Sequence, residues 1–161
     1  MQGKIGLEEH FALEGTLGDS EKFVGPETWK ILRRRLLDFQ SERIEQMDAT
    51  GLERMLLSLN APALQAITDK GEAGEMMRRA NDAMAEHVAR RPDRFSGLAA
   101  LAMHDPDVAA RELERCVKDL GFRGALVNGY TQNASADNLP STGRAPRCRR
   151  PDGVWLLHPE R

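Results

Sequence analysis

Apolar positions along the chain alternate between short continuous runs and longer stretches with helical spacing. The short runs predict strands at residues 4–11, 54–60, 95–102 and 122–128, and residues 154–158 form a candidate fifth strand. The longer stretches predict helices at residues 26–47, 72–90 and 105–119, and residues 12–27, which are rich in glycine, predict a long loop. Strands and helices therefore alternate through most of the chain.

Residues at the predicted helix ends support these boundaries. Gly51 follows the first helix and suits a left-handed C-terminal position. Asp105 can cap the third helix, Pro106 suits its first turn, and Gly121 stops it.

The order of elements predicts an α/β fold. The middle strands are nearly continuous apolar runs, as in a parallel sheet that helices cover on both sides. Repeated with right-handed crossovers, such units close into a (β/α)8 TIM-type barrel of about 250 residues. With 161 residues, this chain supplies a partial barrel, about the first half.

Residues 131–153 interrupt the pattern. They contain few large apolar residues and many Pro, Arg, Ser and Asn, which predicts an irregular or disordered connection. The expected organisation is therefore N-terminal (β/α) repeats at 1–130, this connection at 131–153, and the candidate strand with the chain end at 154–161.

Charge and composition narrow the class of protein. A net charge of -2 argues against a nucleic-acid or anionic-membrane partner, and no apolar run reaches the roughly 18 residues of a membrane span. The N-terminus has no secretory pattern, and the distant Cys116 and Cys148 are expected to be reduced thiols. These features predict a cytoplasmic protein.

Glu8 and His10 are the first candidate site residues. Side chains two positions apart in a strand point to the same face, and the C-terminal ends of barrel strands form the active-site mouth. A carboxylate with an imidazole suits a divalent metal such as Zn²⁺ or Mn²⁺. The alternative from these residues alone is a solvated polar end of a strand.

Two later residues fall at equivalent positions. His158 ends the candidate fifth strand and could complete a set of three metal ligands, or it is a chance histidine in a tail. Asn128 ends the fourth strand and could bind a substrate oxygen, or it forms an Asn-Gly turn. His87 and His104 are expected to have packing or structural roles.

Five motifs, taken together and in order, resemble the gamma-resorcylate (2,6-dihydroxybenzoate) decarboxylases of the amidohydrolase superfamily. They are KIGLEEHF (4–11), LSLNAPA (57–63), RPDRF (91–95), DPD (105–107) and GFRGALVNG (121–129). The EEHF form and the SLNAP sequence favour the gamma-resorcylate type over related decarboxylases.

The resemblance implies a (β/α)8 barrel, one divalent metal and a homotetramer. It places metal ligands at Glu8, His10 and His158 and substrate-pocket residues at Phe23 and Asn128. The family pattern YLHPR is LLHPE here, and the family's acidic proton donor falls beyond Arg161, so no catalytic residue is assigned.

The implied function is metal-dependent, non-oxidative decarboxylation of a small aromatic carboxylic acid such as 2,6-dihydroxybenzoate, with this chain a truncated and weak or inactive form. Two alternatives remain: a metal-dependent hydrolase or hydratase of the same superfamily, and a non-catalytic fragment that associates with a full-length subunit.

Overall fold

The computed structural model describes residues 3–18, 20–127, 130–131 and 134–135. Strands β1 (Lys4–Phe11), β2 (Leu52–Leu59) and β3 (Phe95–Gly97) form one parallel sheet in the order β1-β2-β3. Strands β4 (Ala99–Ala100) and β5 (Ala125–Leu126) form a second parallel pair, and β6 (Tyr130–Thr131) pairs antiparallel with β7 (Ala134–Ser135). The predicted α/β class with parallel strands is confirmed.

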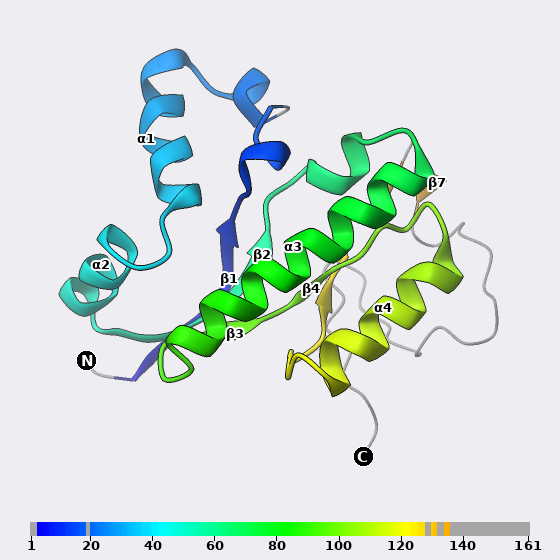
Figure 1. The fold of residues 1–161 in the computed structure, drawn as a ribbon. Coiled ribbons are helices and arrows are strands. Elements are labelled where there is room, and N and C mark those ends of the chain that lie inside the picture. The colour runs from blue at the N-terminus through cyan, green and yellow to red at the C-terminus, as the bar shows by residue number, and fades with distance from the viewer. Residues whose placement is uncertain (1–2, 19, 128–129, 132–133, 136–161) are drawn as a thin grey trace.

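Helix α3 (Lys70–Arg90) runs along one face of the three-stranded sheet (Figure 1). Helices α1 (Pro26–Leu37) and α2 (Glu42–Thr50) lie beside β1, and α4 (Pro106–Lys118) lies beside β4. Three short 3-10 helices complete the described part: η1 (Glu14–Thr16), η2 (Ser20–Phe23) and η3 (Ala63–Ala66). No helix of the described residues is long and apolar enough to cross a membrane.

The predicted single helix at 26–47 is wrong, because the chain breaks after Leu37. The backbone of Asp38 is extended, and its carboxylate accepts hydrogen bonds from the backbone N–H groups of Ser41 (3.1 Å) and Arg43 (2.7 Å). These bonds satisfy donors at the start of α2, which have no partner within that helix. The break also buries Phe39, which is 5% exposed.

Other helix ends match the prediction. Gly51 has a φ of 70° and closes α2, and Gly121, also at 70°, follows α4. The Asp105 carboxylate accepts bonds from the N–H groups of Asp107 and Val108, as a cap should. Asp69 caps α3 in the same way, so this helix begins two residues before the predicted start.

The predicted strand at 95–102 is divided at Leu98, because the chain changes partner there. The Leu98 N–H donates to the carbonyl of Leu57 in β2, and the next N–H, of Ala99, donates to the carbonyl of Gly124. The same stretch therefore pairs first with β2 and then with β5. The candidate strand at 154–158 and most of the segment 131–153 lie outside the described residues.

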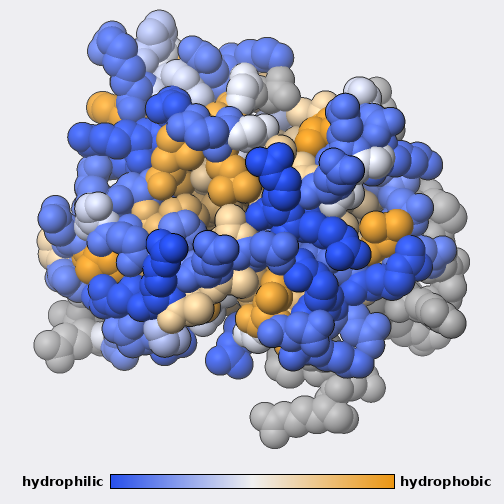
Figure 2. All heavy atoms as spheres, viewed as in Figure 1, coloured by the Kyte–Doolittle hydropathy of each residue, from blue (hydrophilic) through white to orange (hydrophobic). Residues whose placement is uncertain are grey.

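Two apolar clusters hold these elements together. The larger one lies between the sheet and helices α2, α3 and α4, with Leu57, Met77, Met84 and Phe95 among its fully buried members. The smaller one joins Ala12 and Leu17, after β1, to Trp29 and Leu36 of α1. Figure 2 shows apolar residues gathered between α1 and β1 on the face viewed, surrounded by polar side chains.

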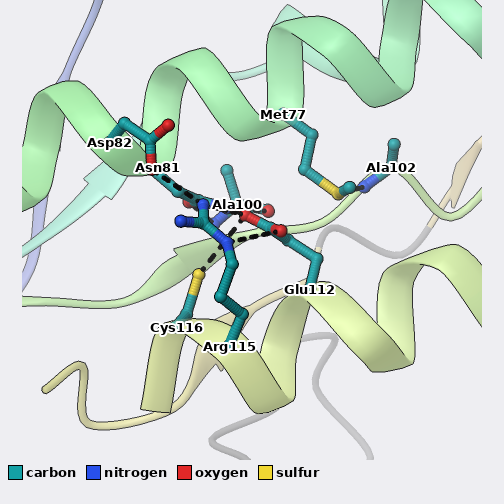
Figure 3. A network of polar contacts seen from close by, with 8 residues as sticks. All are labelled: Met77, Asn81, Asp82, Ala100, Ala102, Glu112, Arg115 and Cys116. Carbon is teal, nitrogen blue, oxygen red and sulfur yellow. Dashed lines mark hydrogen bonds and ion pairs between the residues drawn. The ribbon is translucent and has the colours of Figure 1, made fainter. Parts of the chain in front are cut away.

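A buried polar network connects α3, α4 and β4 (Figure 3). Asn81 accepts a bond from the N–H of Ala100 (2.8 Å) and donates to the carbonyl of the same residue (3.1 Å). It also donates to the carboxylate of Glu112 (2.9 Å), which is 1% exposed and accepts two bonds from Arg115. Asn81 is thus hydrogen-bonded to both the N–H and the carbonyl of Ala100 at the end of a short strand. A buried backbone group without a partner would be costly there.

The charge state of this network follows from its contacts. Burial acts to raise the pKa of Glu112, but hydrogen bonds from Arg115 and Asn81 outweigh it and hold this pKa below its ordinary value. Burial, together with the neighbouring Glu112, raises the pKa of Cys116 to about 12. The Cys116 thiol therefore stays protonated at neutral pH, as a packing residue rather than a nucleophile.

Replacing Asn81 by Ala tests the network's contribution to stability. The change leaves the Ala100 backbone groups and the Glu112 carboxylate without this partner, so the free energy of unfolding should fall by about 2–4 kcal/mol. Urea unfolding followed by circular dichroism measures the loss. The control is Arg79→Ala, an exposed position on the same helix, which should change stability by less than about 0.5 kcal/mol. Equal effects of the two changes would contradict the role given to Asn81.

The Glu112 carboxylate should also make stability depend on pH. Because its folded-state pKa lies below the ordinary value of 4.5, the ionised group stabilises the fold above that pH. This contribution is lost as the pH falls through the folded-state pKa. Glu112→Gln should therefore lower the melting temperature at pH 7, and its deficit should shrink below about pH 4.5. Glu114→Gln, on the exposed side of α4, should show no such convergence with the native chain.

Candidate metal centre

The C-terminal half of β1 is aligned with β2 through an irregular register. Gly6 lies opposite Met55 and Glu9 opposite Leu57, so three steps along β1 correspond to two along β2. This is the signature of a β-bulge, and it leaves Glu8 outside the regular pairing. From Glu9 to Phe11 the register is regular again, and His10 lies opposite Ser58.

The alternation along β2 shows which face His10 uses. Met55, Leu57 and Leu59 belong to the large apolar cluster beneath the helices. Successive side chains of a strand point to opposite faces, so Ser58 lies on the face away from that cluster. The ring of His10 is on this face as well, because its Nδ1 lies 2.9 Å from the Ser58 Oγ.

Glu8 and His10 both line a hollow of about 340 Å³ beside α1 and α2. Most of its lining residues are charged or polar, with Leu32, Leu36 and Met55 as the apolar ones, but apolar atoms form the larger part of its surface. The remaining lining residues are Glu9, Arg35, Asp38, Glu42, Arg43 and Gln46. Met55 and Arg43 place this hollow on the helix side of β1, whereas the ring of His10 lies against Ser58 on the opposite face. The hollow therefore borders the strand at Glu8 and His10 but is not the space that the His10 ring faces, and the bulge that carries Glu8 could not be expected from simple alternation.

The donor set fits part of a divalent-metal site. Glu8 is an exposed carboxylate, and the Ser58 contact at Nδ1 leaves the Nε2 of His10 as the ring nitrogen for a cation. Among the residues that the structure describes, no three His, Cys, Asp or Glu side chains come together as a metal site. The third predicted ligand, His158, lies outside the described residues, as does Asn128.

Arg43 fixes the main chain beside this site. Its guanidinium donates to the carbonyls of His10 (2.9 Å), Arg35 (3.0 Å) and Asp38 (2.8 Å). The same group lies 5.8 Å from the centre of the Phe39 ring. Burial lowers the pKa of Arg43, with Glu9 and Asp38 opposing the shift, but an arginine remains charged at neutral pH. One side chain therefore connects β1, α1 and the break between α1 and α2.

Asn60 fixes the loop that follows β1. It is 5% exposed, and its amide donates to the carbonyl of Thr16 (3.0 Å) and to the hydroxyl of Ser20 (3.0 Å). Its carbonyl accepts a bond from the Thr16 hydroxyl (3.0 Å). Phe23 ends η2 in this loop and is 76% exposed, so the described part of the chain does not enclose its ring.

The two other described histidines lie apart from this hollow. His87 stacks on Phe39 with 3.7 Å between ring centres, which confirms a packing role. His104 precedes the cap of α4, and its ring nitrogens have no hydrogen-bond partner among the described residues. Sequence patterns did not single out Ser58, Arg43 or Asn60 as site-building residues. To find Ser58 from the sequence, one would need the strand register that places it opposite His10, and only the structure gives that register.

The fold has parallel strands joined by helices, and a carboxylate and an imidazole lie near the end of its first strand. A comparison with known protein families identifies the class of protein to which this arrangement belongs. Residues 10–150 match the amidohydrolase family, and the chain belongs to it.

Comparison with individual proteins shows which members of this family the chain resembles. The chain is 62% identical to the gamma-resorcylate decarboxylase of Polaromonas sp. (strain JS666) over 133 residues, which are 83% of this chain and 41% of that protein. It is 52% identical to the gamma-resorcylate decarboxylase of Rhodococcus jostii (strain RHA1), over 99% of this chain and 51% of that protein. The resemblance drawn from the five motifs is confirmed, and the chain spans about half or less of these relatives' length.

Solved structures agree on the fold. A crystal structure of 2,6-dihydroxybenzoate decarboxylase complexed with 2,6-dihydroxybenzoate has a TM-score of 0.80 and 60% identity, and the match covers 83% of this chain and 41% of that one. A dihydroxybenzoic acid decarboxylase from Polaromonas sp. JS666, with bound manganese and the inhibitor 2-nitroresorcinol, gives a TM-score of 0.80 at 63% identity, over 82% of this chain and 40% of that one. The partial-barrel fold expected from the sequence is confirmed.

Replacing Arg43 by Lys tests whether the guanidinium anchors β1. A lysine has one nitrogen and cannot serve three carbonyls in a fixed planar arrangement, so stability should fall by about 1–3 kcal/mol. Arg35→Lys is the matched control, because the exposed side chain of Arg35 pairs with Glu42 on the surface. That change should lower the free energy of unfolding by less than about 0.5 kcal/mol. Denaturant unfolding of both variants measures the difference, and similar losses would remove the special role of Arg43.

Proposed function

We propose that this chain forms the metal-binding first half of a decarboxylase that acts on a hydroxybenzoate such as 2,6-dihydroxybenzoate. The observation that carries the proposal is the position of Glu8 and His10, two residues apart near the end of β1, in a chain 62% identical to a gamma-resorcylate decarboxylase. Relatives with bound manganese support a divalent metal, for which Mn²⁺ and Zn²⁺ are the candidates.

Each residue has a definite part in this proposal. Glu8 and His10 hold the metal, with His158 as the third protein ligand. The bound metal would supply a Lewis acid and a template for the substrate carboxylate and its neighbouring phenolic oxygen. Phe23 contacts the aromatic ring, and the amide of Asn128 binds a substrate oxygen.

Decarboxylation also needs an acid that protonates the ring carbon as CO₂ leaves, a step that contributes about 10²–10⁴-fold. We assign that acid to a carboxylic acid outside residues 1–161, so this chain alone should be weak or inactive. The functional assembly is proposed to be a cytoplasmic homotetramer with no nucleic-acid or membrane partner.

A second candidate function is association with another subunit without catalysis. Among the residues that the structure describes, strand β1 lies at the edge of its sheet, and Ile5 and Leu7 on it are 56% and 66% exposed. Exposed apolar side chains on an unpaired strand edge are typical of a surface that pairs with another chain.

Metal binding and CO₂ release from 2,6-dihydroxybenzoate, with added Mn²⁺ or Zn²⁺, test the proposal. Mn²⁺ should bind to the native chain, and Glu8→Gln and His10→Ala should each weaken binding at least about tenfold. The matched control is Glu9→Gln, one position along the strand, which should bind Mn²⁺ within about threefold of the native chain. Turnover of the native chain should be slow and should disappear with Glu8→Gln.

Other outcomes have clear meanings. If Glu9→Gln weakened Mn²⁺ binding and Glu8→Gln did not, the proposed assignment of Glu8 as a metal ligand would be wrong. Release of a hydrolysis or hydration product instead of CO₂ would favour another reaction of the family. Absence of both metal and turnover would leave the association function as the better description.

A further inference from the structure

Ser58 is a buried polar residue with no part in the function proposed so far. It is 1% exposed, and its Oγ lies 2.9 Å from the Nδ1 of His10. The two residues are direct neighbours in the register of β1 and β2. The contact is therefore built by strand pairing and does not depend on the chance approach of two long side chains.

Both partners of this contact are held in place by their backbones. Ser58 follows the segment of β2 that pairs with β1 on one side and with β3 on the other. The carbonyl of His10 accepts a bond from Arg43 (2.9 Å) on the helix side. With the main chain fixed from both sides, one hydrogen bond to the ring is enough to set its orientation.

The direction of that hydrogen bond decides what His10 can do. A neutral imidazole carries one proton, so one ring nitrogen is a donor and the other has a free lone pair. If Nδ1–H donates to the Ser58 Oγ, then Nε2 has the lone pair that a cation needs. If the serine hydroxyl donates to Nδ1, then Nε2 carries the proton and cannot bind a metal.

We propose that Ser58 is a positioning residue that accepts a hydrogen bond from Nδ1–H of His10, and so presents the Nε2 lone pair in a fixed direction before a metal arrives. Metal-binding histidines commonly donate their other ring N–H to an acceptor, which fixes the tautomer and the ring orientation. The inference rests on the proposed function insofar as His10 is a metal ligand. The tautomer itself is a property of the metal-free chain.

Nitrogen-15 NMR of the histidine rings in the metal-free chain, recorded in alkaline buffer, reports the tautomer directly. His10, assigned by comparison with His10→Gln, should carry its proton on Nδ1 in the native chain. Ser58→Ala should shift the population toward the Nε2–H form and weaken Mn²⁺ binding about 10- to 100-fold. Ser58→Thr keeps a hydroxyl in a strand-compatible side chain and should restore both properties to within about threefold.

Ser96 provides a matched control on the adjacent strand. It is also buried, at 7% exposed, but its hydroxyl contacts Arg54 rather than a histidine. Ser96→Ala should leave the His10 tautomer and Mn²⁺ affinity unchanged. Equal weakening by Ser58→Ala and Ser96→Ala would reduce the effect to a general loss of packing and overturn the proposal.

The native chain alone can also overturn the proposal. A proton on Nε2 of His10 would show that Ser58 donates, whatever the variants do and even if Ser58→Ala fails to fold. The proposed function fails by a different result, namely Mn²⁺ binding that is unaffected by His10→Ala. The two failures are therefore distinguishable.

Discussion

The hydrogen-bonded register between β1 and β2 is the constraint on which the candidate site depends. The bulge between Gly6 and Glu9 shifts the pairing by one residue, and every contact after it follows from that shift. His10 meets Ser58, and the N–H of Asn60 reaches the carbonyl of Phe11 (2.8 Å). Asn60 in turn fixes the loop after β1. A slip of one residue would turn each of these side chains to the other face, so stability and site geometry are set together.

Side chains complete the backbone hydrogen bonding where the regular elements stop. Arg43 serves three carbonyls around the break between α1 and α2, and Asn81 serves both backbone groups of Ala100 beside the point where the chain changes sheet. Asn81 is fully buried and Arg43 is half-buried, and polar groups removed from water are expensive unless they are hydrogen-bonded. Glu112 is likewise buried, and it accepts two hydrogen bonds from the half-buried Arg115. These networks specify one arrangement of helices on the sheet, because any other would leave their donors and acceptors unpaired.

Local patterns in the sequence predicted the strands, the helices and the Asp105 and Gly51 boundaries, since these depend on neighbours within a few residues. The predicted helix at 26–47 was wrong because the Asp38 carboxylate competes for backbone N–H groups, while apolar spacing continues across the break. The strand at 95–102 divides because its partners change, which is a non-local event. The alternation of side chains along a strand, together with the family resemblance, predicted Glu8 and His10 as site residues. The bulge and the Ser58 contact could not be predicted, because both require the register with a strand some 48 positions away.

Under the proposed function, the described residues contribute orientation more than affinity. A catalytic metal centre generally needs three protein ligands, and β1 supplies two. Two ligands hold a cation weakly, but ligands already fixed in direction lose little freedom when it binds. The Arg43 bond to the carbonyl of His10 and the Ser58 contact with its ring meet that requirement from opposite sides of one residue. Ligands that join from later segments, His158 among them, then add affinity to a geometry that the first two strands have set.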